Sequence, residues 1–460
     1  MSDTVSEHVR RQKEFFATGV TRSLDYRLDR LDRLRSMIEE NETAMMDALK
    51  DDLGKPHAEA YTSETGFLLA EIRFVKKHLK RWARPRKVRT MLFHQPAKSR
   101  IVREPYGVVC ILGPWNYPFQ LVLSPLIGAI AGGNCAILKP SELCVRSTAL
   151  LADMIEDYFD PQYLTVVTGN ADRAAELVRQ PFDYIFFTGS TATGKKILKA
   201  AAANMTPCTL ELGGKNVCIV ARDADIPKTA RRIAWGKFFN AGQTCAAPDH
   251  IMVSRDAEEL LKRELKIVLD AFYGDRSRDY ARIINTRHFD RVMSLIEGCN
   301  VIHGGSSDRD SLWIEPTLVD SVTFSDRIME EEIFGPVLPI VGFDDLDELI
   351  AALHGRPKPL ALYVFSRDRN VCDTVIERLS AGTVCVNGTF SQMISFTLPF
   401  GGVGESGMGR YHGRYSFDTF THEKSVMYKS LLFDMSAAYP PYDTNISVIK
   451  KAMRVLFRHI

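Results

Sequence analysis

Two residues in the middle of the chain, a glutamate and a cysteine, have the chemistry of a base and a nucleophile. Glu211 lies among apolar residues and before two glycines, and burial of a carboxyl group raises its pKa toward the range that suits a general base. Cys245 follows the polar turn Gly242-Gln243-Thr244, whereas most other cysteines lie in apolar runs. A thiolate near N–H donors is a strong nucleophile. The alternatives are a structural carboxylate and an inert thiol.

Two polar turns follow apolar, strand-like runs and offer groups that can bind a nucleotide. Gly189 and Ser190 begin a turn that reaches Gly194 and opens a helical segment. Glycine lets backbone approach a phosphate closely, and a helix N-terminus supplies N–H donors. Lys139 and Glu142 can hydrogen-bond the hydroxyls of a ribose. Each motif taken alone is also typical of an ordinary surface turn or a helix cap.

Three further residues could assist the reaction or hold a ligand. Asn116, in the segment Trp115-Asn116-Tyr117-Pro118, can donate its amide to a developing oxyanion. Glu332 and Phe334 precede Gly335-Pro336, and they can hold a ribose and press against a flat ring. Turn chemistry explains the asparagine equally simply, and packing at a turn explains the phenylalanine.

The overall composition is typical of a globular protein with two or three domains. A chain of 460 residues is too long for a single hydrophobic core of ordinary size. Of these residues, 45% are hydrophobic and 25% are charged. With 59 basic and 57 acidic residues the net charge is +2, which gives no reason to expect a nucleic acid partner. The nine cysteines are scattered without a CxxC motif, so neither disulfides nor a metal site is expected. The first 20 residues are charged and lack the apolar run of a signal peptide, and a cytoplasmic location is expected.

The elements that must position these residues follow an alternating pattern. Residues 1–82 are helical in character, and residues 86–105 favour a hairpin or a sheet extension. A first series of apolar strands, separated by helical segments, is predicted at Val108–Leu112, Cys135–Leu138, Leu164–Val167 and Tyr184–Phe187. A second is predicted at Asn216–Val220, His250–Val253, Leu360–Phe365 and Thr383–Asn387. Two parallel-sheet α/β blocks therefore meet near residues 205–215, and a ligand is expected in the cleft between them.

In their order and spacing, the motifs resemble those of the aldehyde dehydrogenase superfamily over about residues 10–430. The resemblance rests on Gly113–Pro118, Lys139–Glu142, Phe187–Ser190, Glu211–Lys215, Gly242–Cys245, Glu332–Pro336 and Leu398–Gly402. The segment Gly404–Gly413 and the Tyr439-Pro440-Pro441 tail are similar to the class-3 branch, whose members act on aromatic and medium- to long-chain aldehydes.

The resemblance implies an α/β fold with a Rossmann-like cofactor domain, an α/β catalytic domain and a small β oligomerisation arm. The implied divisions are an NAD(P)-binding domain (1–85 and 106–208), a catalytic domain (209–405), the arm (86–105 and 406–430) and a C-terminal amphipathic tail (431–460). Cys245 would attack the aldehyde, Asn116 would hold the oxyanion, and Glu211 would activate the water that releases a carboxylic acid. The residues implied to contact NAD or NADP are Lys139, Glu142, Gly189, Ser190, Gly194, Glu332 and Phe334. The implied assembly is a homodimer.

The identity of the aldehyde is left open by the sequence. An aromatic funnel is expected from Trp115, Tyr117, Phe238, Phe239 and Tyr61, and it suits benzaldehyde-like and alkyl aldehydes equally. The sequence of the loop 390–396 differs from the one that is usual in the class-3 branch, so this loop bears on substrate choice. Glu142 favours NAD, because a carboxylate repels a 2′-phosphate. Transfer of the acyl group to coenzyme A and a non-catalytic binding role are the rival functions.

The C-terminal tail carries a short basic amphipathic helix. Its apolar stripe consists of Ile446, Ile449, Met453, Leu456 and Ile460. Such a helix either docks on the protein, which is the favoured expectation, or makes weak peripheral contact with a membrane surface.

Overall fold

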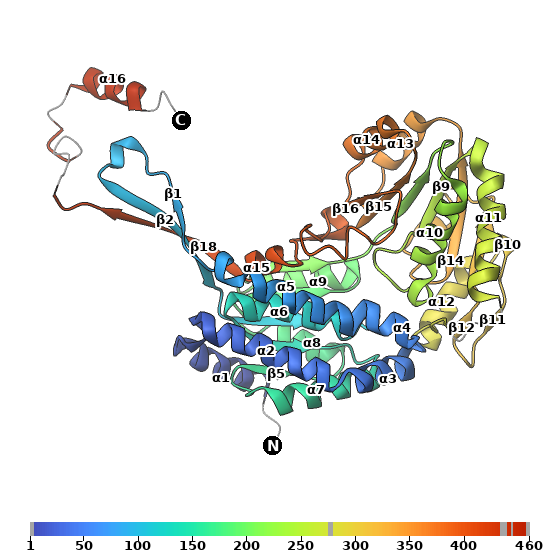
Figure 1. The fold of residues 1–460 in the computed structure, drawn as a ribbon, viewed down its shortest axis with the longest axis horizontal. Coiled ribbons are helices and arrows are strands. Elements are labelled where there is room, and N and C mark those ends of the chain that lie inside the picture. Colours follow the sequence, from blue (N-terminus) through green and yellow to red (C-terminus); the bar gives the residue numbers. More distant parts are fainter. Residues whose placement is uncertain (1–3, 275–278, 433–438, 443–444, 457–460) are drawn as a thin grey trace.

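A computed structural model describes residues 4–274, 279–432, 439–442 and 445–456. Two largely parallel sheets, each accompanied by helices, form the body, and a three-stranded antiparallel sheet projects from it (Figure 1). The alternation of apolar strands and helices along the chain therefore builds the α/β fold that the sequence predicts, and this prediction is confirmed.

The N-terminal part of the chain is helical, as predicted. The first helix begins with a capping box between Thr4 and Glu7, and the third ends at Gly54, whose φ of 64° closes the helix in the left-handed conformation. The helices are α1 (Val5–Ala17), η1 (Val20–Arg22), α2 (Leu24–Glu40), α3 (Glu42–Leu53), α4 (His57–Ala60), the π-helical turn η2 (Tyr61–Thr65) and α5 (Gly66–Trp82).

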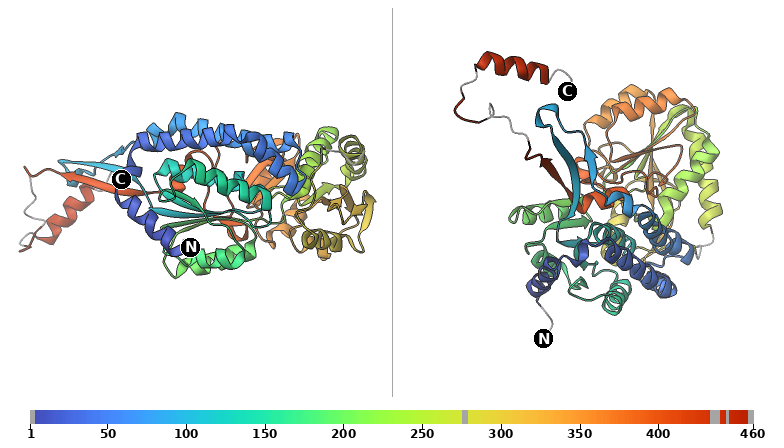
Figure 2. Two further views of the ribbon diagram at one scale, coloured as in Figure 1. Left: turned by 90° about the horizontal axis from the view of Figure 1, so that it is seen from below. Right: turned by 60° about the vertical axis from the view of Figure 1, so that its left-hand side comes forward.

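The first sheet has six strands in the order β17-β7-β6-β3-β4-β5, parallel except for β17. Helices lie on both of its faces (Figure 2, left), which explains why β3, β4 and β6 are buried along their whole length. The strands are β3 (Val108–Leu112), β4 (Cys135–Lys139), β5 (Leu164–Val166), β6 (Tyr184–Thr188), β7 (Cys208–Glu211) and β17 (Gly407–Met408). The helices are α6 (Gln120–Gly132), α7 (Val145–Tyr158), α8 (Ala171–Val178) and α9 (Thr191–Ala202).

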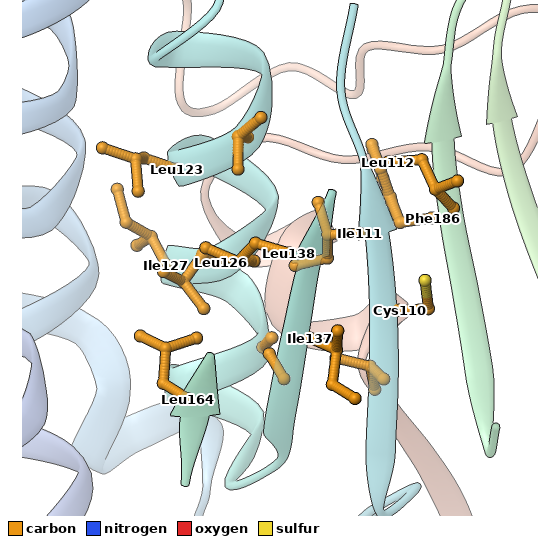
Figure 3. Close-up of a cluster of buried hydrophobic side chains, with 14 of the residues drawn as sticks. Cys110, Ile111, Leu112, Leu123, Leu126, Ile127, Ile137, Leu138, Leu164 and Phe186 are labelled. Carbon is orange, nitrogen blue, oxygen red and sulfur yellow. The ribbon is translucent and has the colours of Figure 1, made fainter. Parts of the chain in front are cut away.

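The core beside this sheet fixes the position of α6. Leu123, Leu126 and Ile127 of α6 lie in one buried cluster with Ile111 and Leu138 of the sheet (Figure 3). Every residue of α6 is buried, including Pro125, which lies inside the helix. Because α6 is packed along its whole length, the loop that joins β3 to it is held at both ends.

The second sheet has seven strands in the order β10-β13-β14-β9-β8-β15-β16, parallel except for β10. The strands are β8 (Val217–Val220), β9 (His250–Ser254), β10 (Asn300–His303), β13 (Thr317–Asp320), β14 (Val337–Phe343), β15 (Ala361–Phe365) and β16 (Thr383–Val386). The helices are α10 (Ile226–Phe238), η4 (Phe239–Gly242), α11 (Arg255–Tyr273), α12 (Thr286–Ile296), η5 (Arg327–Met329), α13 (Leu346–His354) and α14 (Arg369–Arg378). A separate two-stranded sheet pairs β11 (Ser307–Asp308) with β12 (Trp313–Ile314).

The projecting sheet joins segments that are far apart in the sequence. Strand β2 (Ala97–Pro105) pairs with β1 (Arg86–Val88) on one side and with β18 (Thr421–Lys429) on the other, and η3 (Leu92–His94) lies between β1 and β2. Residues 406–430, expected to belong to this arm, divide between two places. Strand β17, after η6 (Gly404–Ser406), pairs with β7 of the first sheet, α15 (Arg414–Thr419) follows it, and β18 alone joins the arm.

The C-terminal helix α16 (Ile446–Leu456) lies beyond the tip of the arm, away from both large sheets (Figures 1 and 2). Its apolar residues Ile446 and Met453 are 62% and 47% exposed. These two residues are therefore not covered by the described part of this chain, and docking of the tail on the protein stays a prediction. Ile460, the last residue of the predicted stripe, lies outside the described residues. Among the described helices, none has the length and apolar character needed to cross a bilayer.

Candidate active site

Cys245 lies where two cavities meet. A cavity of about 430 Å³ runs from this cysteine toward the carboxyl ends of the first sheet's strands, and we call it the polar cavity because its lining includes Asn116, Ser190, Glu211 and Glu332. A second cavity of about 180 Å³, lined mainly by aromatic side chains, reaches the same cysteine. A thiol in this position can contact one molecule in the polar cavity and another in the aromatic cavity.

The backbone before Cys245 is built to turn sharply. Asn240 and Ala241 have φ values of 53° and 51°, in the left-handed region that non-glycine residues rarely adopt. Gly242 follows with a φ of 74°, and a Cβ atom there would lie 2.3 Å from the carbonyl oxygen of Gly335. Asn216 at the start of β8 then donates its side-chain amide to the Cys245 carbonyl oxygen over 2.6 Å. These contacts fix the cysteine turn to the second sheet.

The polar cavity brings together most of the residues expected to act or to bind the cofactor. Adjacent parallel strands end at one edge of a sheet, so the residues that follow β3 and β6 lie beside the end of β7. The predicted residues that line the cavity are Asn116, Gly189, Ser190, Glu211, Cys245, Glu332 and Phe334. Lys139, Glu142 and Gly194 lie outside its lining.

Glu211 is the last residue of β7 and is only 3% exposed. Neither of its carboxyl oxygens accepts a hydrogen bond from the described residues. Burial raises the pKa of this carboxyl group well above its usual range. A carboxylate with free lone pairs and a raised pKa has the properties of a general base.

The surroundings of Cys245 disfavour ionisation of its thiol. Burial and, to a smaller extent, the nearby carboxyl groups of Glu332 and Glu211 raise its pKa, backbone N–H groups of the cysteine turn lower it, and the net pKa is about 12. At neutral pH the thiol form therefore dominates in the ligand-free protein, and attack on a carbonyl carbon must be coupled to loss of the proton.

Asn116 lies in the loop between β3 and α6, and it is 3% exposed. Its side-chain amide nitrogen donates to the carbonyl oxygen of Gln243 over 3.0 Å, two residues before the cysteine. An amide nitrogen carries two hydrogens, so the second is available to an oxygen atom in the cavity. The tie to Gln243 holds this donor close to the cysteine turn.

Glu332 and Phe334 form the wall opposite the first sheet. The Glu332 carboxyl group lies against Gly213, where a Cβ atom would be 2.1 Å from Oε2, so a larger residue there would displace this carboxyl group. Burial raises the pKa of Glu332 to about 8. Phe334 has a φ of 47°, and its ring meets that of Trp115 edge-on, with 5.4 Å between centroids.

The remaining predicted cofactor residues have identifiable local contacts. Ser190 caps α9, where its Oγ accepts the N–H of Thr193 over 3.3 Å. Lys139 ends β4, and its ammonium group donates to Pro140 O over 2.8 Å and lies 3.5 Å from the Glu142 carboxylate. A Cβ atom on Gly194 would be 2.7 Å from a methyl group of Leu212, so this glycine permits close packing of α9.

Two residues of α12 that line the polar cavity were missed by the sequence analysis. His288 and Arg291 lie near the start of α12 and line the cavity. Arg291 donates to the carbonyl oxygens of Glu332 and Ile333 over 3.2 and 2.6 Å, and thereby holds the Glu332 loop. Their side chains follow no motif, and only the packing of α12 brings them to the site.

The aromatic cavity differs from the expected funnel. Tyr117 and Phe239 line it as predicted, and the Tyr117 hydroxyl is 2.5 Å from that of Thr244. Trp115 lines the polar cavity instead. Phe238 is completely buried in the core and Tyr61 is 46% exposed, and neither lines either cavity. Phe390, Met393 and Ile394 of the loop 390–396, which was expected to bear on substrate choice, also line it. The aromatic residues that were missed are Phe67, Trp235, Phe400, Tyr411 and His412.

Comparison with known proteins identifies the family of the chain. The family model described as "Aldehyde dehydrogenase family" matches residues 2–426. A 4,4'-diaponeurosporen-aldehyde dehydrogenase of Staphylococcus aureus is 47% identical over 443 residues, which cover 95% of this chain and 96% of that protein. The dimeric NADP-preferring aldehyde dehydrogenase of Rattus norvegicus is 46% identical over 443 residues, covering 95% of this chain and 98% of the relative.

A solved structure shows the same fold in three dimensions. The substrate-bound state of Staphylococcus aureus AldH superposes with a TM-score of 0.96 at 46% identity, and the match covers 98% of this chain and 100% of that one. Further relatives, 42% identical, are named as family 3 members, in agreement with the predicted class-3 branch. The resemblance seen in the motifs is thus confirmed, and the chain belongs to the aldehyde dehydrogenase family.

Proposed function

We propose that this protein oxidises an aromatic or a medium- to long-chain aliphatic aldehyde to the carboxylic acid, with NAD or NADP as the electron acceptor. The observation that carries the proposal is the position of Cys245 between a polar cavity, which contains Glu211 and Asn116, and an aromatic cavity. This arrangement gives an aldehyde and an electron acceptor separate approaches to one nucleophile.

The polar cavity fits a dinucleotide cofactor. Ser190 and Thr191 line it at the N-terminus of the 12-residue helix α9, where free N–H groups and the helix dipole suit a pyrophosphate. The Lys139–Glu142 pair follows β4 at the same sheet edge and suits the hydroxyls of a ribose. Glu332 and Phe334 would contact the nicotinamide half. When bound, the dinucleotide would accept a hydride, one proton with two electrons, from the aldehyde carbon.

Within this proposal, the chain's own residues carry the remaining chemistry. The Cys245 thiol gives its proton to solvent water as its sulfur bonds to the aldehyde carbon, and the carbonyl oxygen becomes an oxyanion. That oxyanion accepts hydrogen bonds from the Asn116 amide and the Cys245 backbone N–H. After oxidation the acyl group is held on Cys245 as a thioester. Glu211 removes a proton from a water molecule, which displaces the thiol and releases the acid.

The aromatic cavity supports the proposed substrate class. Its volume of about 180 Å³ corresponds to roughly six water molecules at ~30 Å³ each, which suits one ring or a medium alkyl segment. Burial of each additional CH₂ group contributes about 0.8 kcal/mol, so apolar aldehydes of this size are favoured over short ones.

A panel of aldehydes assayed with each cofactor tests the proposed function. We expect benzaldehyde and hexanal to exceed acetaldehyde in kcat/KM by roughly tenfold or more, because each fills the aromatic cavity. We expect NAD to be used better than NADP, since the Glu142 carboxylate repels a 2′-phosphate. Acid must form without coenzyme A. Absence of turnover with every aldehyde, or a strict requirement for coenzyme A, would contradict the proposal.

A matched pair of variants tests whether the aldehyde binds in the aromatic cavity. Trp235 lines the aromatic cavity and is 43% exposed, whereas Tyr61 is 46% exposed and lies outside it. Trp235→Ala should raise the KM of benzaldehyde by roughly tenfold and leave that of acetaldehyde nearly unchanged. Tyr61→Ala should change neither value. Equal effects of the two variants would show that the aldehyde binds elsewhere.

Assembly and location are also proposed from the residues. The arm of β1, β2 and β18 projects from the body and leaves two edge strands, so pairing with a second copy is the proposed basis of a homodimer, which sedimentation of the full chain tests. All nine cysteines are free, which is typical of proteins in the reducing cytoplasm.

The exposed helix α16 is the proposed site of weak peripheral membrane contact. Its exposed apolar residues Ile446 and Met453 accompany Lys450, Lys451 and Arg454, a pattern suited to an anionic lipid surface. We expect the full chain to bind vesicles that contain phosphatidylserine weakly, and a chain that lacks residues 445–460 not to bind. Equal flotation of the two proteins would rule out this role for the tail.

A further inference from the structure

A buried ion pair lies beneath the loop that carries Asn116. The side chains of Lys55 and Glu64 are both 0% exposed, and Lys55 Nζ lies 2.5 Å from Glu64 Oε1. Lys55 follows the end of α3, and Glu64 lies in the π-helical turn η2, so the pair joins the two ends of the short helix α4. Neither residue lines the polar or the aromatic cavity.

Lys55 contacts the Asn116 segment directly. Its ammonium group donates to the main-chain carbonyl oxygen of Asn116 over 3.1 Å, and it lies 4.2 Å from the centre of the Tyr117 ring. A second donor, the side-chain amide of Asn240, reaches the same carbonyl oxygen over 3.1 Å. The backbone of Asn116 is therefore held from the N-terminal helices and from the cysteine loop.

Glu64 holds the other end of the same loop. Its Oε2 accepts the backbone N–H groups of Phe119 and Gln120 over 3.0 and 3.2 Å. These N–H groups belong to the first turn of α6, which has no carbonyl partners of its own, and a carboxylate also complements the helix dipole there. One ion pair thus restrains residues 116–120 at both ends.

Stability alone does not account for a charged pair at this place. Two ions lose their hydration on burial, and replacing both members of a buried pair by neutral residues is often neutral or stabilising. A direct effect on the direction of the Asn116 side chain does account for it. One amide hydrogen already bonds to Gln243 O, so the direction of the second depends on where the Asn116 backbone is held.

We infer that Lys55 and Glu64 are positioning residues that aim the Asn116 amide at the oxyanion on the substrate. This inference rests on the role of Asn116 in the proposed function. The pair acts on the reaction through the Asn116 backbone and touches no reacting atom. Its loss slows formation of the tetrahedral adduct and leaves the nucleophile and the cofactor cavity in place.

The test is the double variant Lys55→Met/Glu64→Gln. The glutamine still accepts the N–H groups of α6, and no unpaired charge stays buried, so the variant is expected to fold. We expect kcat for aldehyde oxidation to fall roughly 10- to 100-fold, because small displacements of an oxyanion donor have effects of this size. The KM of the cofactor should stay within about twofold.

A second measurement separates positioning from general damage. Iodoacetamide alkylates a thiol by displacing iodide, without forming an oxyanion, so the alkylation rate of Cys245 reports the nucleophile alone. We expect this rate to stay within about twofold in the double variant. In an Asn116→Ala background the double substitution should change kcat by less than about twofold, since both act through one hydrogen bond.

Arg27→Met supplies the matched control. Arg27 is also a buried cation, 7% exposed, that donates to main-chain carbonyl oxygens, among them Ala131 O near the far end of α6 over 3.2 Å. This variant should lose stability and keep kcat. A similar fall of kcat in both variants, an alkylation rate that falls in parallel with kcat, or additive effects with Asn116→Ala would overturn the inference.

The proposed function and the positioning role of Lys55 and Glu64 are contradicted by different results. If the wild-type protein oxidises no aldehyde, or Asn116→Ala keeps full kcat, the proposed function or the role of Asn116 is wrong, and the inference falls with it. If Asn116→Ala is impaired and Lys55→Met/Glu64→Gln is not, the proposed function stands and the positioning role alone is overturned.

Discussion

Replacing Cys245 with alanine is expected to reduce acid formation by roughly 10⁴-fold or more, the size of effect seen when an enzyme loses its nucleophile. The thiol is the reactive group on which the polar and the aromatic cavity converge. An alanine removes the sulfur and adds no charge or bulk, so the Kd of the cofactor should stay within about twofold. Steady-state turnover and titration of the cofactor against the variant measure the two effects separately.

Cys299→Ala is the matched control for this substitution. Cys299 is a free, partly exposed thiol like Cys245, but it lines neither cavity. Its replacement should leave kcat within about twofold of the wild-type value. Retained turnover in Cys245→Ala would reject the covalent mechanism, and equal losses in the two variants would attribute the effect to misfolding.

The parts of the fold that sequence reasoning recovered are those whose burial leaves a simple pattern. Strands such as Val108–Leu112 are buried on both faces, so an unbroken apolar run in the sequence predicts them. The elements between residues 286 and 343 were missed. Strand β10 is exposed or half-buried throughout and lies at the sheet edge, so its composition resembles that of a loop. Parallel pairing with β9 and β13, which is a tertiary effect, defines β14.

The same distinction applies to the site. Cys245 and Asn116 are recognisable because each lies in a turn motif, and Glu211 because it precedes two glycines at the end of an apolar run. His288 and Arg291 reach the polar cavity only because α12 packs beside it. In the sequence, Lys55 and Glu64 resemble the many other charges of a helical region, and their complete burial follows from how α3, η2 and α6 meet.

In the proposed mechanism, the two cavities allow one cysteine and one glutamate to serve two chemical steps. The approach from the aromatic side brings an apolar molecule to Cys245, while Glu211 and Asn116 face the polar side. The acyl group stays on the sulfur between the steps, so no reactive species has to leave the site. Acid release then depends on a base that is absent from the first step, and this makes the two steps separable by substitution.

Glu211→Gln is expected to stop the cycle after one oxidation. The glutamine preserves the shape of the side chain but cannot remove a proton from water, and loss of a general base costs roughly 10²- to 10⁴-fold in rate. Stopped-flow mixing with excess aldehyde should therefore show a burst of reduced cofactor close to one equivalent per active site, followed by a much slower steady state. Mass spectrometry of the stalled enzyme should find the acyl group on Cys245.

The pH dependence gives an independent signature of the same base. Burial raises the pKa of Glu211 well above its usual range, and a base is active only when deprotonated, so the wild-type hydrolysis rate should rise with pH and level off above that pKa. The residual hydrolysis of Glu211→Gln should lack this rise. Glu71→Gln is the matched control, because Glu71 is fully buried but its carboxylate accepts hydrogen bonds from Ser124 and Gly413 outside both cavities. If Glu211→Gln shows no burst, or keeps the wild-type pH profile, a different group activates the water. Glu332 is then the first residue to test, because its pKa is raised to about 8.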